Sequence, residues 1–281
     1  MKKLLTLILA LSMAVGLCAC GGGGDEPASA DADASTGEAV TLKVACTPNP
    51  HADILRQVVD VLAEEGITLE IQEYTDYVTP NVAVDEGDMD ANFFQHAPYM
   101  ESFNEEKGTS LVSVASIHYE PMGIYAGTTA TIEELADGAT IAVPNDTTNE
   151  ARALQLLAKL GLIEINPEAG LNATPNDITA NPKNLQFKEL EAAMLPQTVG
   201  EVDLSVINSN YALQGGLNPA TDALASEDAE SESAQTYANI IAVKAGNENN
   251  EAIQALIKAL QSDAVREYIN TTYSGSVVPM F

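Results

Sequence analysis

Basic residues are scarce in this chain of 281 residues. It has 12 Lys and Arg against 41 Asp and Glu, which gives a formal net charge of −29. No cluster of Lys or Arg follows residue 3. Because nucleic-acid binding depends on clustered cations that neutralise phosphates, this composition argues against a nucleic-acid partner.

Cysteine is scarce as well. Two of the 3 cysteines, Cys18 and Cys20, lie close to the start of the chain. Cys46 is the only other thiol, so no structural disulfide can form without Cys20, and the folded part must be held together by packing. Cys46 ends an apparent strand, and we interpret it as a small buried hydrophobic residue rather than a nucleophile.

Recognisable catalytic motifs are missing. The sequence has no Gly-x-Ser-x-Gly elbow, no phosphate-binding loop and no persuasive Cys-His pair. We therefore expect no enzyme, no cofactor and no metal. One rival hypothesis stays open, because the 3 histidines, His51, His96 and His118, all follow predicted strands and could hold zinc together with Glu120. A zinc site of this kind would give Arg152, a candidate anion-binding residue described below, no role in ligand binding.

No apolar run near the start is long enough to cross a bilayer as a helix. Residues 4–17 are apolar, follow Lys2 and Lys3, and end at Leu17-Cys18-Ala19-Cys20. This pattern resembles a bacterial lipobox with Cys20 as the lipid acceptor, which implies acylation, for example with palmitate. We expect residues 1–20 to be a lipoprotein signal peptide and residues 21–39 a flexible tether. The folded part would then be lipid-anchored on the extracytoplasmic face of the cell membrane.

Short apolar runs alternate with helical periods in the rest of the chain. With 46% hydrophobic residues, the chain can bury a sizeable core in two lobes. Strands separated by helices predict an α/β protein with parallel sheets covered on both faces and ligand sites at the carboxyl ends of strands. We expect strands at residues 41–46, 69–73, 111–117, 123–126, 140–143, 185–187, 204–207 and 240–243, and helices from residue 52, around 99–106, at 251–261 and at 263–273.

Residues 140–152 predict a strand that turns directly into a helix. Thr147 and Glu150 have the spacing of a capping box, which places the helix start here. Arg152 follows in the opening turns, where a cation opposes the helix dipole. We therefore expect an anion between Arg152 and the free amides, and a small carboxylate is the natural candidate. The alternative is that Arg152 pairs with a nearby Glu or Asp.

Motifs that follow the predicted strands occur in the order of a known family. Over residues 41–281 the chain resembles the NlpA-type substrate-binding lipoproteins, the methionine receptors of bacterial ABC importers. The resemblance rests on Thr47-Pro48, Pro50-His51-Ala52, Asp76-Tyr77-Val78, Asp90-Ala91-Asn92, Phe94-Gln95-His96, Pro98-Tyr99, Glu120-Pro121-Met122-Gly123, Pro144-Asn145-Asp146, Thr148-Asn149, Arg152, Val206-Ile207-Asn208 and Asn210-Tyr211-Ala212.

This resemblance implies a type II periplasmic-binding-protein fold, with two α/β lobes that close on a ligand between them. We expect the two hinge crossings near residues 124–127 and 237–240. One lobe would comprise residues 41–124 and 240–281, and the other residues 125–239. Hinge closure would act as the switch, because a ligand that contacts both lobes favours the closed state.

The resemblance also implies L-methionine as ligand and an ABC permease with its ATPase as partners. Arg152 would bind the carboxylate, and an aromatic box would enclose the thioether. The family commonly has Pro, Gly and Arg where this chain has Thr147, Ala151 and Gln197, so another small amino acid or a methionine dipeptide remains an alternative. The implied ligand-binding residues are Tyr77, Asn92, Phe94, His96, Tyr99, Asn149, Arg152 and Asn208.

Overall fold

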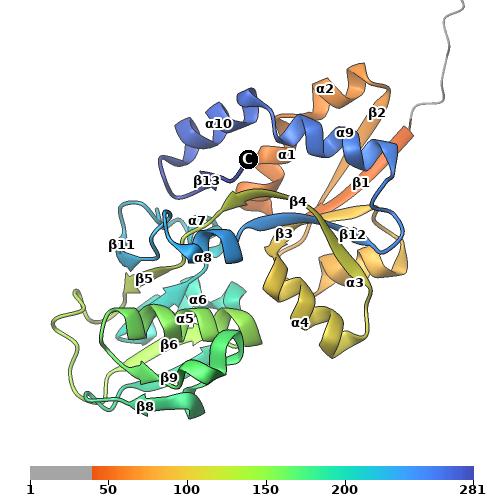
Figure 1. The fold of residues 1–281 in the computed structure, drawn as a ribbon. Coiled ribbons are helices and arrows are strands. Elements are labelled where there is room, and N and C mark those ends of the chain that lie inside the picture. The colour runs from red at the N-terminus through yellow and green to blue at the C-terminus, as the bar shows by residue number, and fades with distance from the viewer. Residues whose placement is uncertain (1–39) are drawn as a thin grey trace, which may run out of the picture. The chain divides into compact units, whose positions relative to one another are not determined.

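A computed structural model describes residues 40–281 of the protein (Figure 1). The predicted signal peptide, the lipid acceptor Cys20 and the predicted tether lie outside these residues. Within residues 40–281, none of the helices has both the length and the apolar character needed to cross a membrane.

The first sheet has six strands in the order β13-β4-β12-β3-β1-β2. Strands β1, β2 and β3 are parallel, whereas β12 runs antiparallel to both β3 and β4. The expected parallel arrangement was therefore wrong for this sheet, because β12 enters it on the chain's return from the second sheet. The strands are β1 (Val40–Cys46), β2 (Ile67–Glu73), β3 (Ala91–His96), β4 (Leu111–Tyr119), β12 (Asn239–Lys244) and β13 (Val278–Pro279).

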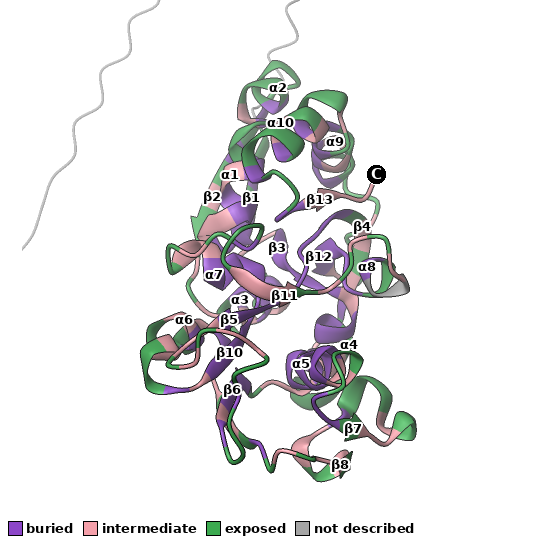
Figure 2. Cartoon of the chain, turned by 90° about the vertical axis from the view of Figure 1, so that its left-hand side faces the viewer, coloured by how far each residue is buried: buried purple, intermediate pink, exposed green. Residues whose placement is uncertain are grey.

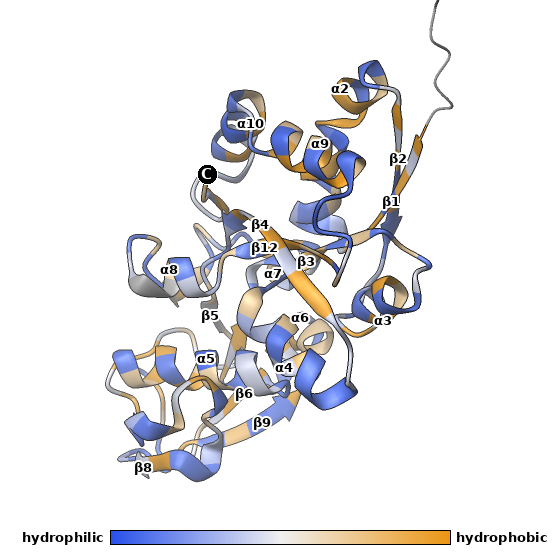
Figure 3. Cartoon of the chain, turned by 45° about the vertical axis from the view of Figure 1, so that its right-hand side comes forward, coloured by the Kyte–Doolittle hydropathy of each residue, from blue (hydrophilic) through white to orange (hydrophobic). Residues whose placement is uncertain are grey.

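Helices cover both faces of this sheet. Buried residues of α1 (Asp53–Arg56), α2 (Val59–Glu64), α9 (Glu251–Leu260) and α10 (Asp263–Tyr273) form one core with β1. The buried positions of α9 recur every three or four residues, and Figure 3 shows the hydrophobic stripe that they form. On the other face, α3 (Thr79–Glu86) and α4 (Ala97–Lys107) pack through Val84 and Met100. The single helix expected from residue 52 is broken between Arg56 and Val59.

The second sheet has five strands in the order β11-β5-β10-β6-β9. It is also mixed, since β10, β6 and β9 are parallel but β5 runs antiparallel to its two neighbours. Helix α5 (Thr147–Lys159) packs on one face through Leu154 and Leu157, and α6 (Leu195–Thr198) and α7 (Ser209–Gln214) pack on the other. The strands are β5 (Gly123–Ala126), β6 (Thr140–Pro144), β9 (Gln186–Leu190), β10 (Leu204–Ile207) and β11 (Ala223–Ser226).

Shorter elements complete the fold. Strands β7 and β8 form a separate two-stranded sheet. The central strands of the large sheets are buried, whereas helices such as α9 and α10 have both buried and exposed residues (Figure 2). The remaining elements are β7 (Glu164–Ile165), β8 (Ile178–Ala180), α8 (Glu232–Thr236), a π-helix at Pro48–Ala52 and 3-10 helices at Pro167–Asn172, Pro175–Asp177, Ala192–Met194 and Val199–Glu201.

The chain passes between the two large sheets twice. Strand β4 ends at Tyr119 in the first sheet, and β5 begins at Gly123 in the second. This passage precedes the expected 124–127, because Ile124 is already paired with Val206. The return lies between β11 and β12 and contains α8. We propose that residues 120–122 and 227–238 are the two lobe boundaries.

Gly127 follows β5 at a place where backbone segments approach closely. A Cβ atom there would lie 2.1 Å from the carbonyl oxygen of Val202 and 2.5 Å from that of Val199. We expect Gly127→Ala to lower the free energy of unfolding by about 2 kcal/mol, because rigid backbone atoms must move. Urea denaturation followed by circular dichroism measures this. Gly200→Ala is the control, because its Cβ would meet no atom within 4 Å; an equal loss in both variants would contradict the prediction.

Candidate functional site

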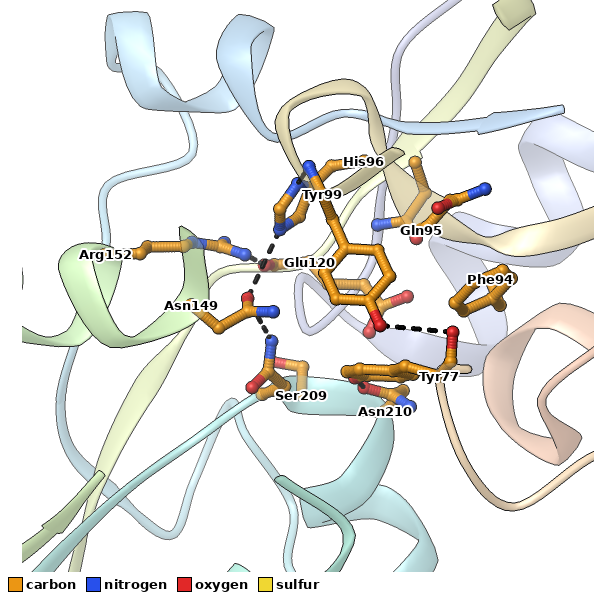
Figure 4. A pocket seen from close by; sticks show the side chains of 12 residues that line it. Tyr77, Phe94, Gln95, His96, Tyr99, Glu120, Asn149, Arg152, Ser209 and Asn210 are labelled. Atoms are coloured by element: carbon orange, nitrogen blue, oxygen red, sulfur yellow. Dashed lines mark hydrogen bonds between the residues drawn. The ribbon is translucent and has the colours of Figure 1, made fainter. Parts of the chain in front are cut away.

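A cavity lies between elements of the two large sheets, at the ends of β3, β4 and β10 and the start of α5 (Figure 4). About 340 Å³ between its side chains is free of protein atoms, a space that includes the opening to solvent. Apolar rings and polar groups both contribute to its wall. The lining residues are Tyr77, Phe94, Gln95, His96, Tyr99, Glu120, Asn149, Arg152, Asn208, Ser209, Asn210 and Asn239.

Asn92 is the one predicted site residue that does not line this cavity. Its side-chain amide donates to Asn81 Oδ1 at 2.9 Å and contacts the carbonyl of Pro80. Asn92 lies earlier in β3, before an irregularity between Phe93 and Gln95 where the pairing with β12 shifts by one residue. It belongs there to a buried amide network with Asn81 and Gln95 inside the first lobe.

Three aromatic rings from the first lobe form the apolar wall. The Tyr77 ring centroid lies 5.6 Å from that of Phe94 and 5.7 Å from that of Tyr99. Tyr211 of α7, which the sequence did not mark as a site residue, extends this group at 4.8 Å from Tyr77. The Tyr77 hydroxyl donates to Asn210 Oδ1 at 2.6 Å, so the wall is joined to the second lobe.

His96 contributes a polar group rather than a fourth apolar ring. Its Nδ1 accepts from the Tyr99 amide, so its Nε2 carries the proton and donates to Asn149 Oδ1 at 3.2 Å. Burial, together with the nearby Arg152 charge, lowers the pKa of His96 to about 3, so the ring is neutral. Asn149 Oδ1 also accepts from Asn208 Nδ2 at 2.8 Å.

Two buried amide atoms of the cavity residues lack a hydrogen-bond partner among the described residues. They are the acceptor Asn208 Oδ1 and the donor Asn210 Nδ2. A buried polar atom without a partner costs free energy. Each is therefore available to a polar ligand, one for a hydrogen-bond donor and the other for an acceptor.

Arg152 is buried at the polar end of the cavity, with only 3% of its surface exposed. Its Nε donates to Glu227 Oε1 at 2.8 Å and its Nη2 to Glu227 Oε2 at 2.5 Å. Nη2 also donates to the backbone carbonyl of Glu120, and the Tyr237 ring lies 4.4 Å from the guanidinium carbon. The structure thus shows the alternative arrangement, in which Arg152 pairs with a glutamate, and this glutamate lies 75 residues further along the chain.

Opposing effects act on the pKa of each member of this pair. Burial acts to raise the pKa of Glu227, but the Arg152 guanidinium outweighs it and the pKa lies below the ordinary value. Burial acts to lower the pKa of Arg152, but the Glu227 carboxylate raises it. Both groups are therefore ionised, and Glu227 and the Glu120 carbonyl engage Nε and Nη2 of Arg152.

The start of α5 orients Asn149 and Arg152. The helix begins at Thr147, one residue before the start that the predicted capping box implies, and the capping residue is Asp146, whose Oδ1 accepts from the Asn149 amide at 3.1 Å and from Asn149 Nδ2 at 2.8 Å. The predicted capping box was wrong, because Asp146 has the extended backbone that a cap requires. The Thr147 hydroxyl instead donates to Glu106 across the lobes.

The three histidines lie in two separate places. His96 lies apart from the other two, so the zinc site of three histidines does not form. His51, His118 and Glu120 are buried together, and their ligating atoms lie within 4.8 Å of one another. His118 Nε2 is 2.7 Å from Glu120 Oε1, and His51 Nε2 is 3.3 Å from the same oxygen. Of these three groups, only Glu120 lines the cavity.

Sequence reasoning missed several lining residues. Gln95, Ser209 and Asn210 are direct neighbours of predicted residues, and Glu120 was considered only as a zinc ligand. Asn239 begins β12, and no motif in the sequence marked it. Glu120, Gln95 and Asn210 lie inside the motifs on which the family resemblance rests. That position is the signal by which they could have been predicted to line the site.

Two α/β lobes joined by two crossings, with a cavity lined from both, define a substrate-binding protein of the type II periplasmic fold. The family model described as NlpA lipoprotein matches residues 42–281. The chain belongs to this family.

Similar proteins cover most of the chain. Membrane lipoprotein TpN32 of Treponema pallidum is 42% identical over 238 residues, which are 85% of this chain and 87% of the relative. Methionine-binding lipoprotein MetQ of Bacillus subtilis is 39% identical over 241 residues, which are 84% of this chain and 87% of the relative. The structure of a nutrient-binding protein from Burkholderia cenocepacia bound to methionine has a TM-score of 0.81 and 42% identity, and the match covers 85% of this chain and 100% of that one.

Glu150 provides a test of the electrostatics at the start of α5. Its Oε1 is buried without a partner, and burial, with Glu189 and Asp146 nearby, raises its pKa to about 7 from 4.5. A raised carboxyl pKa contributes stability that is full below pH 4.5 and is lost as the pH rises through 7. We expect Glu150→Gln to increase the free energy of unfolding by about 1–2 kcal/mol at pH 8 and to change it little at pH 5. Urea denaturation at both pH values measures this, and the exposed Glu133→Gln is the control; no difference between the two pH values would contradict the prediction.

Proposed function

We propose that this protein is a lipid-anchored receptor on the extracytoplasmic face of the membrane that binds L-methionine and delivers it to an ABC importer. The observation that carries the proposal is one cavity with aromatic rings on one side and a buried guanidinium with unpartnered amide atoms on the other. An amino acid with an apolar side chain matches this arrangement, because it has charged groups at one end and an apolar group at the other. The permease and ATPase of the importer are its proposed partners, and it catalyses no reaction.

The polar end of the cavity suits the ligand carboxylate. Glu227 occupies Nε and Nη2 of Arg152, so the carboxylate would bind at Nη1 and accept a second hydrogen bond from Asn210 Nδ2. Hydrogen bonds that involve ionised groups are roughly twice as strong as neutral ones. Asn149 and Asn208 complete this end, and His96 holds Asn149 in position.

The aromatic wall suits the thioether. Tyr77, Phe94 and Tyr99 surround the opposite end of the cavity. Burial of an apolar side chain of this size contributes about 1.5–3 kcal/mol, and each sulfur–ring contact adds about 0.3–1.5 kcal/mol. The two ends belong to different lobes, so a bound ligand favours the closed conformation by contacting both.

The family names support methionine as the first ligand to test. Six similar proteins have methionine-binding names, five of which specify D-methionine, and one solved neighbour holds methionine. The anchor rests on the lipobox at Cys20, and relatives named membrane lipoproteins support it.

The first test is a thermal-shift panel of amino acids and methionine dipeptides on a soluble form without residues 1–20. We expect L-methionine to give the largest shift, because ligand at a hundred times its dissociation constant stabilises the folded state by about 2.7 kcal/mol. A flat panel would overturn the proposal. A larger shift from another amino acid or a dipeptide would support the proposed receptor function but replace L-methionine as its ligand.

Variants at the polar end test the binding mode. We expect Arg152→Ala or Asn208→Ala to abolish the methionine shift, because each removes a partner of a charged ligand group. Arg152→Ala also leaves Glu227 buried without its cation, so Arg152→Ala combined with Glu227→Gln separates lost binding from lost stability. Arg56→Ala is the control, since Arg56 forms an exposed ion pair with Asp53. Wild-type affinity in the Arg152 and Asn208 variants, measured by calorimetry, would contradict this binding mode.

A further inference from the structure

Helix α7 joins the two lobes through residues that do not line the cavity. It follows β10 of the second sheet, and its buried residues Tyr211 and Ala212 belong to a core of the second lobe. The first two residues of the helix, Ser209 and Asn210, line the cavity, whereas Tyr211 and Leu213 do not. The binding mode proposed above therefore gives no role to the later part of this helix.

Leu213 packs against the core of the opposite lobe. The buried members of that core all belong to the first lobe. Among the described apolar residues that pack on it, Leu213 is the one that comes from the second lobe. The helix lies against the segment Pro48–Ala52, which follows β1. An apolar side chain in this position is removed from water only while the lobes are together, so its burial stabilises the closed arrangement.

A second apolar contact connects the lobes in the opposite direction. Tyr77 of the first lobe packs against the core of the second lobe that contains Tyr211. The two ring centroids lie 4.8 Å apart, and the ring planes are 35° from parallel. Each lobe thus places an apolar side chain against the core of the other.

One hydrogen bond accompanies these apolar contacts. The Tyr211 hydroxyl donates to the backbone carbonyl of Thr75 in the first lobe at 3.1 Å. Tyr211 is buried, so water does not compete for this bond in the present arrangement. A typical intramolecular hydrogen bond changes an equilibrium constant by a factor of about 2–10.

The partners of α7 lie at the same edge of the first sheet as the cavity. Strands β1, β2 and β3 are parallel, so their carboxyl ends share one edge. The segment Pro48–Ala52 follows β1 and Thr75 follows β2, while the end of β3 lines the cavity. We therefore expect that separating the lobes to admit a ligand also separates α7 from these partners.

We infer that Tyr211 and Leu213 determine the affinity of the receptor through lobe closure, by contacts between the lobes that do not involve the ligand. The inference rests on the proposed function. A ligand between the lobes is retained only while they are together, so its apparent affinity falls with the population of the closed conformation. Weakening the contacts of α7 should therefore weaken every ligand of the cavity by the same factor.

Calorimetry with L-methionine and with L-norleucine, in which a methylene group replaces the sulfur, tests the inference at Leu213. We expect Leu213→Ala to bind both compounds about 10-fold more weakly, because it removes the apolar contact with the first lobe. Leu213→Met has a similar volume and should stay within about 3-fold of the wild type. Norleucine is measured by displacement with methionine.

Ile178→Ala is the matched control for Leu213→Ala. Ile178 of β8 is also partly buried, but it packs against the second lobe's own core. Its truncation should lower stability without changing the affinity for either compound. A loss of affinity in Leu213→Ala with none in Ile178→Ala separates lobe closure from a general loss of stability.

Tyr211→Phe tests the hydrogen bond separately and changes the packing little. It keeps the ring on Tyr77 and removes the donor to the Thr75 carbonyl, so we expect about 3-fold weaker binding of both compounds. Tyr125→Phe is its control, because Tyr125 is buried in the same core and its hydroxyl has no partner among the described residues. It should keep the wild-type affinity.

Two results would overturn the inference and leave the proposed function intact. The first is wild-type affinity in both Leu213→Ala and Tyr211→Phe. The second is a loss that differs between methionine and norleucine, because such a loss would place the effect at the cavity wall. If Leu213→Ala does not fold, Tyr211→Phe decides the question. A wild-type protein that binds no amino acid would reject the proposed function itself.

Discussion

A guanidinium buried between two lobes must be paired, and this requirement organises the centre of the molecule. Arg152 projects from α5 of the second lobe and takes its partner, Glu227, from the segment that returns to the first sheet. It also bonds to the carbonyl of Glu120 in the other passage. Glu227 in turn accepts from the Met122 amide and the Tyr119 hydroxyl, so one ion pair joins both passages to α5. Within residues 40–281 these two passages are the connections of the chain between the two large sheets, so the same contacts lie at the polar end of the cavity and beside both connections.

The two lobes contribute different chemistry for a physical reason. In the first lobe, β3 is buried along its whole length, and the rings of Phe94 and Tyr99 pack with Val82 of α3 and Phe103 of α4. In the second lobe, the end of β10 and the start of α7 present amide atoms of Asn208 and Asn210 that have no partner among the described residues. A ligand that satisfies those amides while burying its side chain against the rings stabilises the closed arrangement in two independent ways.

The local structure was largely predictable, whereas the long-range pairing was not. Strands β5 and β10 and helices α9 and α10 follow periodic patterns with clear ends, and the structure confirms them within a residue. Strand β3 is absent from the predicted strands, because all six of its residues are buried and the alternation that identifies a strand is missing. Its polar residues, such as Asn92 and Gln95, are satisfied by an amide network that no local pattern reveals.

The site residues were likewise predictable from local patterns but not from long-range pairing. Arg152 could be predicted to need an anion from its place near a helix start, but the identity of that anion depended on Glu227, which lies in an acidic segment where no single carboxylate stands out. Tyr77, His96 and Thr147 connect the lobes in the same way, through hydrogen bonds to Asn210, Asn149 and Glu106. The partners in each of these bonds are at least 41 residues apart in the chain, so the contacts between the lobes, like the pairing of Arg152 with Glu227, depend on the complete fold and leave no mark on the local sequence.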